Sequence, residues 1–413
     1  MRKLRKPIYF VAGHYTMSMG SGRPEFNPKK ERPGLEYYIQ EAGKGVMAQI
    51  GGEAQKIDEG VIGNFMAARY NHQGHLAAFI PSIDPALLYK PCMRVEGACA
   101  SGGLALTSAI KSVLAEMADV VLALGVEVQN TVKAVYGADY LAGAGHYAGE
   151  RKNGHAHFFP GKFSDRAGAY GAKFGQEATR EAMANWYAQA IENARTCPLA
   201  QEYTNSVPDL VKQGMTPPNP KVFMEHLNLY DCSKVSDGGA GILCVSEEGL
   251  QKLGIPKEKA VRVVGYGQVE ADLTKSPDDL TRLSTSERAA QVAYEMSGLG
   301  PKEIGTLEIH DCFTITAVLS MEAAGFAGHG EGPALIKSGR TKRSGDIPTN
   351  TTGGLVGYGH PTGATGVRQM VDLWKQLTGQ AGNSQISMAK PHGMMINMGG
   401  NDRTVVCIIV EKG

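Results

Sequence analysis

The stretch that decides how this 413-residue chain folds and functions reads Val95-Glu96-Gly97-Ala98-Cys99-Ala100-Ser101-Gly102-Gly103-Leu104. Apolar residues recur at helical spacing directly after it, so a helix is predicted to begin beside Cys99. Unpaired backbone N–H groups and the macrodipole at a helix N-terminus favour a thiolate, and the small neighbours leave room for a substrate. A lone cysteine of this kind is more often a packed core residue. Its function therefore depends on what the rest of the chain supplies.

Composition and charge narrow the class of protein. The chain has 42% hydrophobic residues, enough for one large or two medium domains, and its formal net charge of +1 gives no reason to expect nucleic acid or a membrane as a partner. The seven cysteines form no Cys-x-x-Cys pair, which indicates a reducing compartment. His155 and His157 have no carboxylate cluster nearby, so no metal site is predicted. The chain has neither a signal-peptide core nor a run of 18 apolar residues, so a cytoplasmic protein is expected.

The order of predicted elements repeats along the chain. Strand and helix patterns alternate at 8–12, 37–50, 59–63, 104–117 and 118–127, and again at 261–267, 286–299, 304–310, 367–377, 393–397 and 404–410. This repetition predicts an internal duplication of two α/β halves. Residues 1–127 and 221–255 are expected to form the N-terminal half, and 256–413 the C-terminal half. Residues 128–220 are expected to be an inserted loop region that covers a binding site.

Two further segments carry histidines where a site would form. His360 lies in the glycine-lined turn at 357–366 that opens a helix, and it is predicted to be the base that activates a cysteine. His310 and Cys312 follow a predicted buried strand, at the edge where open α/β sheets gather their sites. The turn at 397–401 offers backbone N–H groups to an oxyanion, although a plain hairpin turn fits this segment equally well.

Together these segments resemble the signature loops of the thiolase superfamily. The motifs are Cys-Ala-Ser-Gly-Gly after Glu96-Gly97, His-Asp-Cys-Phe at 310–313, Asn350-Thr351-Thr352-Gly353-Gly354, and Gly-His-Pro-Thr-Gly-Ala-Thr-Gly at 359–366. The His-Asp-Cys-Phe motif is similar to that of sterol-carrier-protein-type thiolases and their bacterial and archaeal relatives. The resemblance implies an α/β fold in five layers, α-β-α-β-α. It also implies an acyltransferase with coenzyme A as co-substrate and no covalently bound cofactor.

The resemblance also assigns roles by position. It makes Cys99 the nucleophile that accepts the acyl group and His360 the group that deprotonates it. His310 and His360 would line one oxyanion hole, and the backbone N–H groups of Cys99 and Gly399 would form a second. Such a site cleaves a 3-oxoacyl-CoA by thiolysis or runs the reverse Claisen condensation, and the sequence does not choose the direction.

One departure from the family pattern concerns the C-terminal loop. Asn397 stands where the usual thiolases have a second cysteine, so Cys312 is expected to take over the acid/base role. The alternatives are a condensing synthase of the HMG-CoA type, an acetoacetyl-CoA thiolase that feeds an HMG-CoA synthase, and a non-thiolytic scaffold or aldolase-type relative. The intact Cys99 argues against the last of these.

The covering region and the Asn350 loop give the only hints about the substrate. Phe158, Lys162, Arg166 and Asn350 are expected to bind it. Since a simple fatty-acyl tunnel needs no cations, the hypothesis is an aromatic or carboxylated acyl group, such as that of benzoylsuccinyl-CoA. The alternative is that these charges are solvated or contact CoA phosphates. The resemblance further implies a homodimer or a dimer of dimers, and a small accessory protein with a zinc ribbon and an OB fold.

Overall fold

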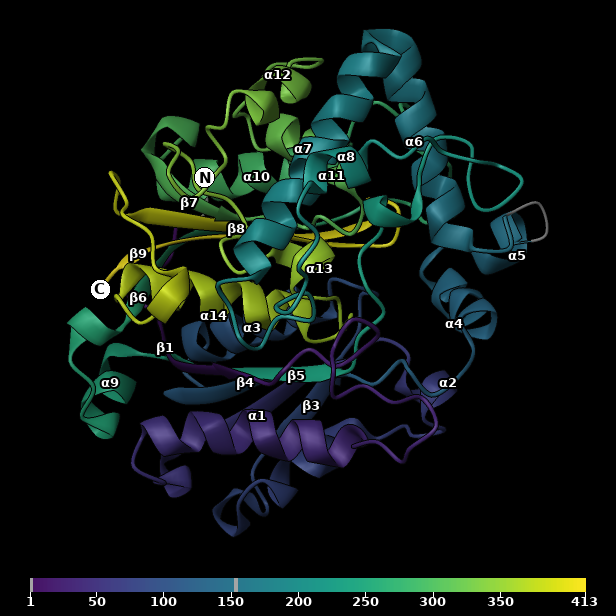
Figure 1. Cartoon of the computed structure of the whole chain (residues 1–413). Helices are drawn as coiled ribbons and strands as arrows, with labels where there is room; N and C mark the ends of the chain where they lie inside the picture. The colour runs from purple at the N-terminus through teal and green to yellow at the C-terminus, as the bar shows by residue number, and fades with distance from the viewer. Residues whose placement is uncertain (1–2, 152–154) are drawn as a thin grey trace.

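A computed structural model describes residues 3–151 and 155–413 of the chain. Its elements stack as helices, strands, helices, strands and helices (Figure 1). Helix α1 (Leu35–Gln49) covers one outer face, and α10 (Ser284–Ser297) and α11 (Thr314–Ala323) cover the other. Helices α3 (Ser101–Leu114) and α14 (Thr365–Leu377) lie between the two groups of strands. The predicted α/β fold in five layers is confirmed.

The strands of the described residues form one hydrogen-bonded order, β3-β2-β4-β5-β1-β6-β9-β8-β7. They are β1 (Tyr9–Tyr15), β2 (Glu59–Gly63), β3 (Cys92–Val95), β4 (Val120–Glu127), β5 (Gly238–Val245), β6 (Val261–Glu270), β7 (Ile304–Glu308), β8 (His392–Gly399) and β9 (Thr404–Lys412). The N-terminal group ends at β1 and the C-terminal group begins at β6. A short antiparallel pairing of Tyr9 with Arg262 and Phe10 with Val261 joins them. Each group combines parallel and antiparallel pairs, as a duplicated α/β unit would.

The two central helices approach each other through glycine. A Cβ atom added to Gly102 on α3 would lie 2.7 Å from the backbone nitrogen of Gly366 and 2.9 Å from the carbonyl oxygen of Gly363, at the start of α14. No side chain fits in that space, so glycine is needed for this crossing. Because Cys99 precedes α3 and His360 precedes α14, the crossing brings these two residues together.

The segment at 128–220, expected to be an inserted loop region, is largely helical. It forms α4 (Ala134–Leu141), α5 (Tyr147–Glu150), α6 (Phe158–Phe174), α7 (Gln176–Ala194) and α8 (Leu210–Gly214). Helix α7 packs against α11, α12 (Gly332–Lys337) and α13 (Gly354–Gly357), so this region is anchored on the C-terminal half.

The remaining helices are short. They are α2 (Ala67–Tyr70) and α9 (Glu247–Leu253). Among the described helices, none combines the length and the apolar character that crossing a bilayer requires.

Candidate active site

A cavity of about 440 Å³ opens where loops from both halves of the chain meet. Cys99, His310, Cys312 and His360 all line it. The sulfur of Cys99 and a ring nitrogen of each histidine lie within 4.8 Å of one another. The two imidazole rings meet edge to face, with their centroids 5.0 Å apart. The turn before α3, the segment after β7 and the turn before α14 therefore place their reactive side chains on one wall.

Cys99 lies in the turn that leads into α3. Ala98, directly before it, has a left-handed backbone conformation with φ 54°, which bends the chain sharply at this point. The pKa of the Cys99 thiol is raised to about 12, first by burial and then by the Glu127 carboxylate, while hydrogen bonds from backbone groups including Gly400 act to lower it. The thiolate expected from the helix N-terminus is therefore not the resting state. Burial outweighs the helix, and Cys99 rests as a thiol.

His360 is a neutral imidazole beside that thiol. Its Nδ1 lies 2.7 Å from Oγ1 of Thr365, the first residue of α14. Its Nε2 is buried and has no hydrogen-bond partner among the described residues. Burial and then the positive charge of Arg368 lower the pKa of His360 to about 3. The ring is therefore unprotonated near neutral pH, as a general base requires.

His310 is held from behind by Asn397. Nδ2 of Asn397 lies 3.2 Å from Nδ1 of His310 and also donates to the carbonyl oxygen of Cys99 at 3.0 Å. Oδ1 of the same side chain accepts from the backbone N–H of Gly103 at 3.0 Å. Burial, then His360 and Arg368, lower the pKa of His310 well below its ordinary value. Asn397 thus ties the nucleophile loop, α3 and the second histidine together.

Cys312 lines the same cavity and is itself buried. Its sulfur lies 3.9 Å from Oγ1 of Thr316. Burial and then the neighbouring Cys99 raise the pKa of the Cys312 thiol well above its ordinary value. Cys312 is therefore a protonated thiol within reach of the cavity, with a proton to give.

Known proteins share this fold and these sequence segments. Residues 32–248 match the family described as thiolase, N-terminal domain, and residues 267–412 match the one described as thiolase C-terminal domain-like. This chain belongs to the thiolase family. The resemblance on which the motifs were interpreted is confirmed, and the protein is an acetyl-CoA acetyltransferase-like thiolase enzyme.

Individual relatives match over most of the thiolase. An acetyl-CoA acetyltransferase of Methanothermobacter thermautotrophicus is 35% identical over 375 residues, which is 91% of this chain and 94% of the relative. The benzoylsuccinyl-CoA thiolase subunit BbsB of Thauera aromatica is 30% identical over 316 residues, 76% of this chain and 78% of the relative. The solved structure of an Ltp2-ChsH2(DUF35) aldolase superposes with a TM-score of 0.79 at 21% identity, covering 100% of this chain and 99% of that one.

Glu127 is a residue of this thiolase that none of the sequence motifs contains. It ends β4, is fully buried, and accepts hydrogen bonds from both halves of the molecule. The donors are the side chains or backbone N–H groups of Asn64, Phe65, Met66, Thr362 and Gly363. Two of them lie in the turn that carries His360, so Glu127 fixes that turn on the N-terminal half. The signal in the sequence was an acidic residue closing the apolar run at 118–127.

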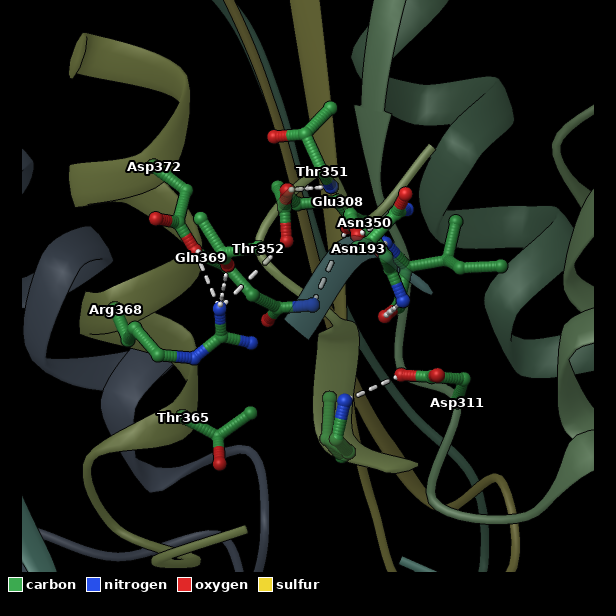
Figure 2. Close-up of polar contacts among 12 residues, drawn as sticks. Asn193, Glu308, Asp311, Asn350, Thr351, Thr352, Thr365, Arg368, Gln369 and Asp372 are labelled. Carbon is green, nitrogen blue, oxygen red and sulfur yellow. Dashed lines mark hydrogen bonds and ion pairs between the residues drawn. The ribbon is translucent and has the colours of Figure 1, made fainter. Parts of the chain in front are cut away.

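A buried polar network supports the segment that carries His310 (Figure 2). Nε2 of Gln369 on α14 donates to the carbonyl oxygens of Glu308, at 3.2 Å, and Ile396, at 3.1 Å. Asn350 receives the backbone N–H of Ile309 on Oδ1 at 2.8 Å and donates Nδ2 to the carbonyl of the same residue at 3.2 Å. Asn350 is therefore placed behind His310 and does not line the cavity.

Arg368 is the charged centre of that network. Its Nη1 donates to Oγ1 of Thr352 at 3.1 Å and pairs closely with Asp372, and it lies 3.9 Å from Oε2 of Glu308 (Figure 2). The guanidinium is buried between the two carboxylates, which is the pairing that a buried charge requires. Burial is the main cause of the low pKa values of both histidines, and the positive charge of Arg368 lowers them further.

Helix α6 contributes aromatic side chains to the cavity. Phe163 stacks on Phe313 of the His-Asp-Cys-Phe segment, with ring centroids 4.6 Å apart. Phe159 and Phe163 line the cavity, whereas the neighbouring Phe158 is buried outside its lining.

The two cations expected to bind substrate already have partners in the protein. Nζ of Lys162 donates to Glu150 at 2.8 Å. The Arg166 guanidinium is buried and donates to Oδ1 of Asn401 at 2.6 Å and to main-chain carbonyls. Neither side chain lines the cavity. The argument for a carboxylated substrate from these two cations therefore loses its basis.

Gly399, predicted as the second backbone donor, lies next to the residue that faces the cavity at this turn. Gly400, not Gly399, lines the cavity and hydrogen-bonds toward the Cys99 sulfur. Gly399 packs against the loop of Cys99, where an added Cβ atom would overlap the carbonyl oxygen of Gly97.

Proposed function

We propose that this thiolase cleaves a 3-oxoacyl-CoA with coenzyme A, and runs the reverse Claisen condensation, through an acyl group carried on Cys99. The observation that carries the proposal is the clustering of the Cys99 sulfur with ring nitrogens of His310 and His360 within 4.8 Å, on a cavity that Cys312 also lines. A nucleophile, a base, an oxyanion donor and a proton donor are the four groups that this reaction needs.

Acyl transfer to the enzyme begins with the thiol. Nε2 of His360 takes the proton of Cys99, and the sulfur attacks the keto carbon of the substrate. Backbone N–H groups of Cys99 and of residues 399–400 stabilise the oxyanion that forms on that carbon. The bond between the keto carbon and its α-carbon then breaks, and its electron pair stays on the α-carbon as the enolate of the departing acyl-CoA. His310 and the protonated His360 face the thioester oxygen of that enolate.

Proton transfer at the α-carbon completes the first half of the reaction. Cys312 gives its thiol proton to the α-carbon, and the acyl-CoA that contains this carbon and the substrate's own coenzyme A leaves, while the shortened acyl group stays on Cys99. Coenzyme A then enters, gives its thiol proton to the Cys312 thiolate and attacks the acyl carbon on Cys99. The Cys99 sulfur leaves and recovers its proton from His360. In the condensing direction the same steps run backwards, with the Cys312 thiolate taking the α-proton.

The cavity supports an apolar acyl group of aromatic size as the substrate. Four phenylalanines lie among its lining residues, at 159, 163, 223 and 313. The lining contains one lysine, Lys234, which already faces Glu202 at 3.5 Å. A relative whose name includes benzoylsuccinyl-CoA is consistent with an aromatic acyl group. A carboxylate on that group finds no free cation among the described lining residues.

Mass spectrometry of the intact chain after incubation with an acyl-CoA tests the mechanism. We expect one acyl adduct, located on Cys99 by peptide mapping, and none in Cys99→Ala. Coenzyme A-dependent cleavage should be lost in the same variant. Cleavage by Cys99→Ala, or an adduct on another residue, would contradict the proposal. Comparing acetoacetyl-CoA with a 3-oxo-3-phenylpropanoyl-CoA tests the substrate class, and a clear preference for acetoacetyl-CoA would reject the aromatic group.

We also propose that the enzyme is a homodimer and that it works in a reducing compartment. We further propose that an accessory protein binds it. All seven cysteines are free thiols, which supports a reducing compartment. Strand β3 ends the strand order, with Met93 42% exposed and nearby Tyr89 99% exposed, so this edge offers a surface to a second copy. The structurally similar aldolase is named as a pair of proteins, Ltp2 and ChsH2, and this supports the proposal that a second protein binds this chain. Light scattering of the purified chain tests the dimer, and a monomer would refute it.

A further inference from the structure

We infer that Asn397 and Thr365 hold the two active-site histidines in opposite tautomers, with the ring proton of His310 on Nε2 and that of His360 on Nδ1. Both rings are neutral, so each carries one proton, and the partner of Nδ1 decides which nitrogen holds it. The two partners have opposite hydrogen-bonding character. Asn397 and Thr365 are thus positioning residues that act through the histidines they contact.

The orientation of the Asn397 amide fixes the tautomer of His310. The backbone N–H of Gly103 can only donate, and it points to one end of the amide at 3.0 Å, which must be Oδ1. The carbonyl oxygen of Cys99 can only accept, and it faces the other end at 3.0 Å, which must be Nδ2. Nδ2 is therefore the atom that lies 3.2 Å from Nδ1 of His310. An amide nitrogen can only donate, so Nδ1 is the acceptor and the proton of His310 resides on Nε2.

The Thr365 hydroxyl imposes the other tautomer on His360. Its oxygen lies 3.1 Å from the carbonyl oxygen of Pro361 and 2.7 Å from Nδ1 of His360. Nε2 of His360 is buried with no partner among the described residues, so a proton there would be an unsatisfied donor. The ring proton therefore lies on Nδ1, and the hydroxyl directs its own proton to Pro361. It then accepts from His360, whose proton is on Nδ1. The lone pair of Nε2 is left free.

Opposite tautomers give two identical side chains two different tasks. An Nε2–H on His310 donates to a developing oxyanion, whereas a bare Nε2 on His360 accepts the proton of Cys99. Were both rings in one tautomer, the site would have two bases or two donors. The tasks rest on the function proposed above, but the tautomers do not. They also explain why an asparagine suits position 397, where the usual thiolases have a second cysteine. The Asn397 amide sets the tautomer of His310, and Cys312 supplies the thiol proton instead.

The tautomers can be measured directly in the full chain without substrate. In the protein labelled with ¹⁵N-histidine, nitrogen chemical shifts distinguish a protonated ring nitrogen from an unprotonated one. The signals are assigned by their loss in His310→Gln and in His360→Gln. We expect an unprotonated Nδ1 in His310 and an unprotonated Nε2 in His360. The same tautomer in both rings, or the reverse assignment, would overturn the inference. Since no substrate is present, this result is independent of whether the chain is a thiolase.

Variants at Thr365 test the link between tautomer and rate. Thr365→Val keeps the shape but removes the acceptor of Nδ1–H, so His360 should populate the Nε2–H tautomer. Without the hydrogen bond that favours the Nδ1–H tautomer, fewer His360 rings have a bare Nε2. The kcat of Cys99 acylation should therefore fall about tenfold, with KM little changed. Thr365→Ser, the matched control, should keep both the tautomer and the rate. A lower kcat in Thr365→Val with an unchanged tautomer would mean a merely structural role and would refute the inference.

Asn397→Ala tests the other histidine in the same way. Without the amide donor, His310 should populate both tautomers, and acylation should slow about twofold if the two are equally populated. A wild-type pattern of nitrogen shifts in this variant would show that Asn397 does not set the tautomer. If the variant fails to fold, the wild-type spectrum and the Thr365 pair still decide the question.

Discussion

Gly102→Ala should distort the active site by pushing the two central helices, α3 and α14, apart. The added methyl group would point from α3 into the start of α14, 2.7 Å from the nitrogen of Gly366 and 2.9 Å from the nitrogen of Val367 and the oxygen of Gly363. All three atoms belong to the backbone, so no side chain can rotate away. The two helices must separate for the methyl group to fit.

The size of the effect follows from these distances. Ordinary contacts between nonbonded heavy atoms lie near 3.5 Å, so relieving the 2.7 Å contact would move the helices apart by about 0.8 Å. Forcing a methyl group into a packed core costs about 1–3 kcal/mol, and the better helix propensity of alanine offsets up to about 1 kcal/mol. We expect a net loss of about 1–2 kcal/mol in the free energy of unfolding. Because Cys99 moves with α3 and His360 with α14, acylation should slow by about tenfold or more.

Urea unfolding and single-turnover acylation measure the two effects. Gly34→Ala is the matched control, since Gly34 also stands at a helix start and a Cβ atom added there meets no described heavy atom within 4 Å. It should cost less than about 1 kcal/mol of stability, because alanine is a poorer N-cap than glycine, and it should leave acylation unchanged. Wild-type stability together with a wild-type acylation rate in Gly102→Ala would refute the argument that this crossing sets the distance between the two residues.

Three further predictions concern charge and protons at the site. Glu127→Gln should lower the pKa of Cys99, because the Glu127 carboxylate helps to raise it. Alkylation of Cys99 by iodoacetamide at a fixed pH should therefore become faster, and an unchanged rate would contradict this. Cys312→Ser should still form the Cys99 adduct but should exchange the α-protons of acetyl-CoA with solvent about 10³-fold more slowly, and wild-type exchange would remove Cys312 from its role. His360 is a free base above its pKa of about 3, and Cys99 is a thiol below its pKa of about 12. The kcat/KM of acylation should therefore be flat from about pH 5 to about pH 9, whereas a fall below about pH 6.5 would show that His360 keeps an ordinary pKa.

The sequence predicted strands where apolar residues dominate and missed them where glycine or polar residues interrupt. The strand predicted at 59–63 has those bounds as β2, and the apolar run at 118–127 contains β4. Strand β5 was missed because it begins Gly-Gly-Ala-Gly, a composition typical of a loop. Its glycines serve packing: a Cβ atom added to Gly239 would lie 2.7 Å from the carbonyl oxygen of Tyr38 on α1. Such a contact depends on tertiary structure and leaves no local pattern.

The reactive residues could be predicted from the sequence, but their supporting partners could not. Cys99 and the two histidines stand in local motifs of small residues and glycines, and such motifs are visible in one dimension. The contact of Asn397 with Cys99 joins residues 298 positions apart. Lys162 has a partner that the sequence did not indicate. Its charge suggested a ligand, but Glu150 pairs with it on the folded surface. Whether a charge is free for a substrate depends on neighbours that only the fold determines.

The resting site is uncharged, and this has a consequence for how the reaction starts. Burial holds the pKa of Cys99 high and that of His360 low, so proton transfer between them creates a thiolate and an imidazolium where ions are poorly solvated. That ion pair is unfavourable until a substrate is attacked, because attack moves the negative charge from sulfur to an oxygen that faces hydrogen-bond donors. Proton transfer and attack are therefore coupled. A small alkylating reagent gains no such stabilisation at its leaving group, so Cys99 should react slowly with it while reacting readily with an acyl-CoA.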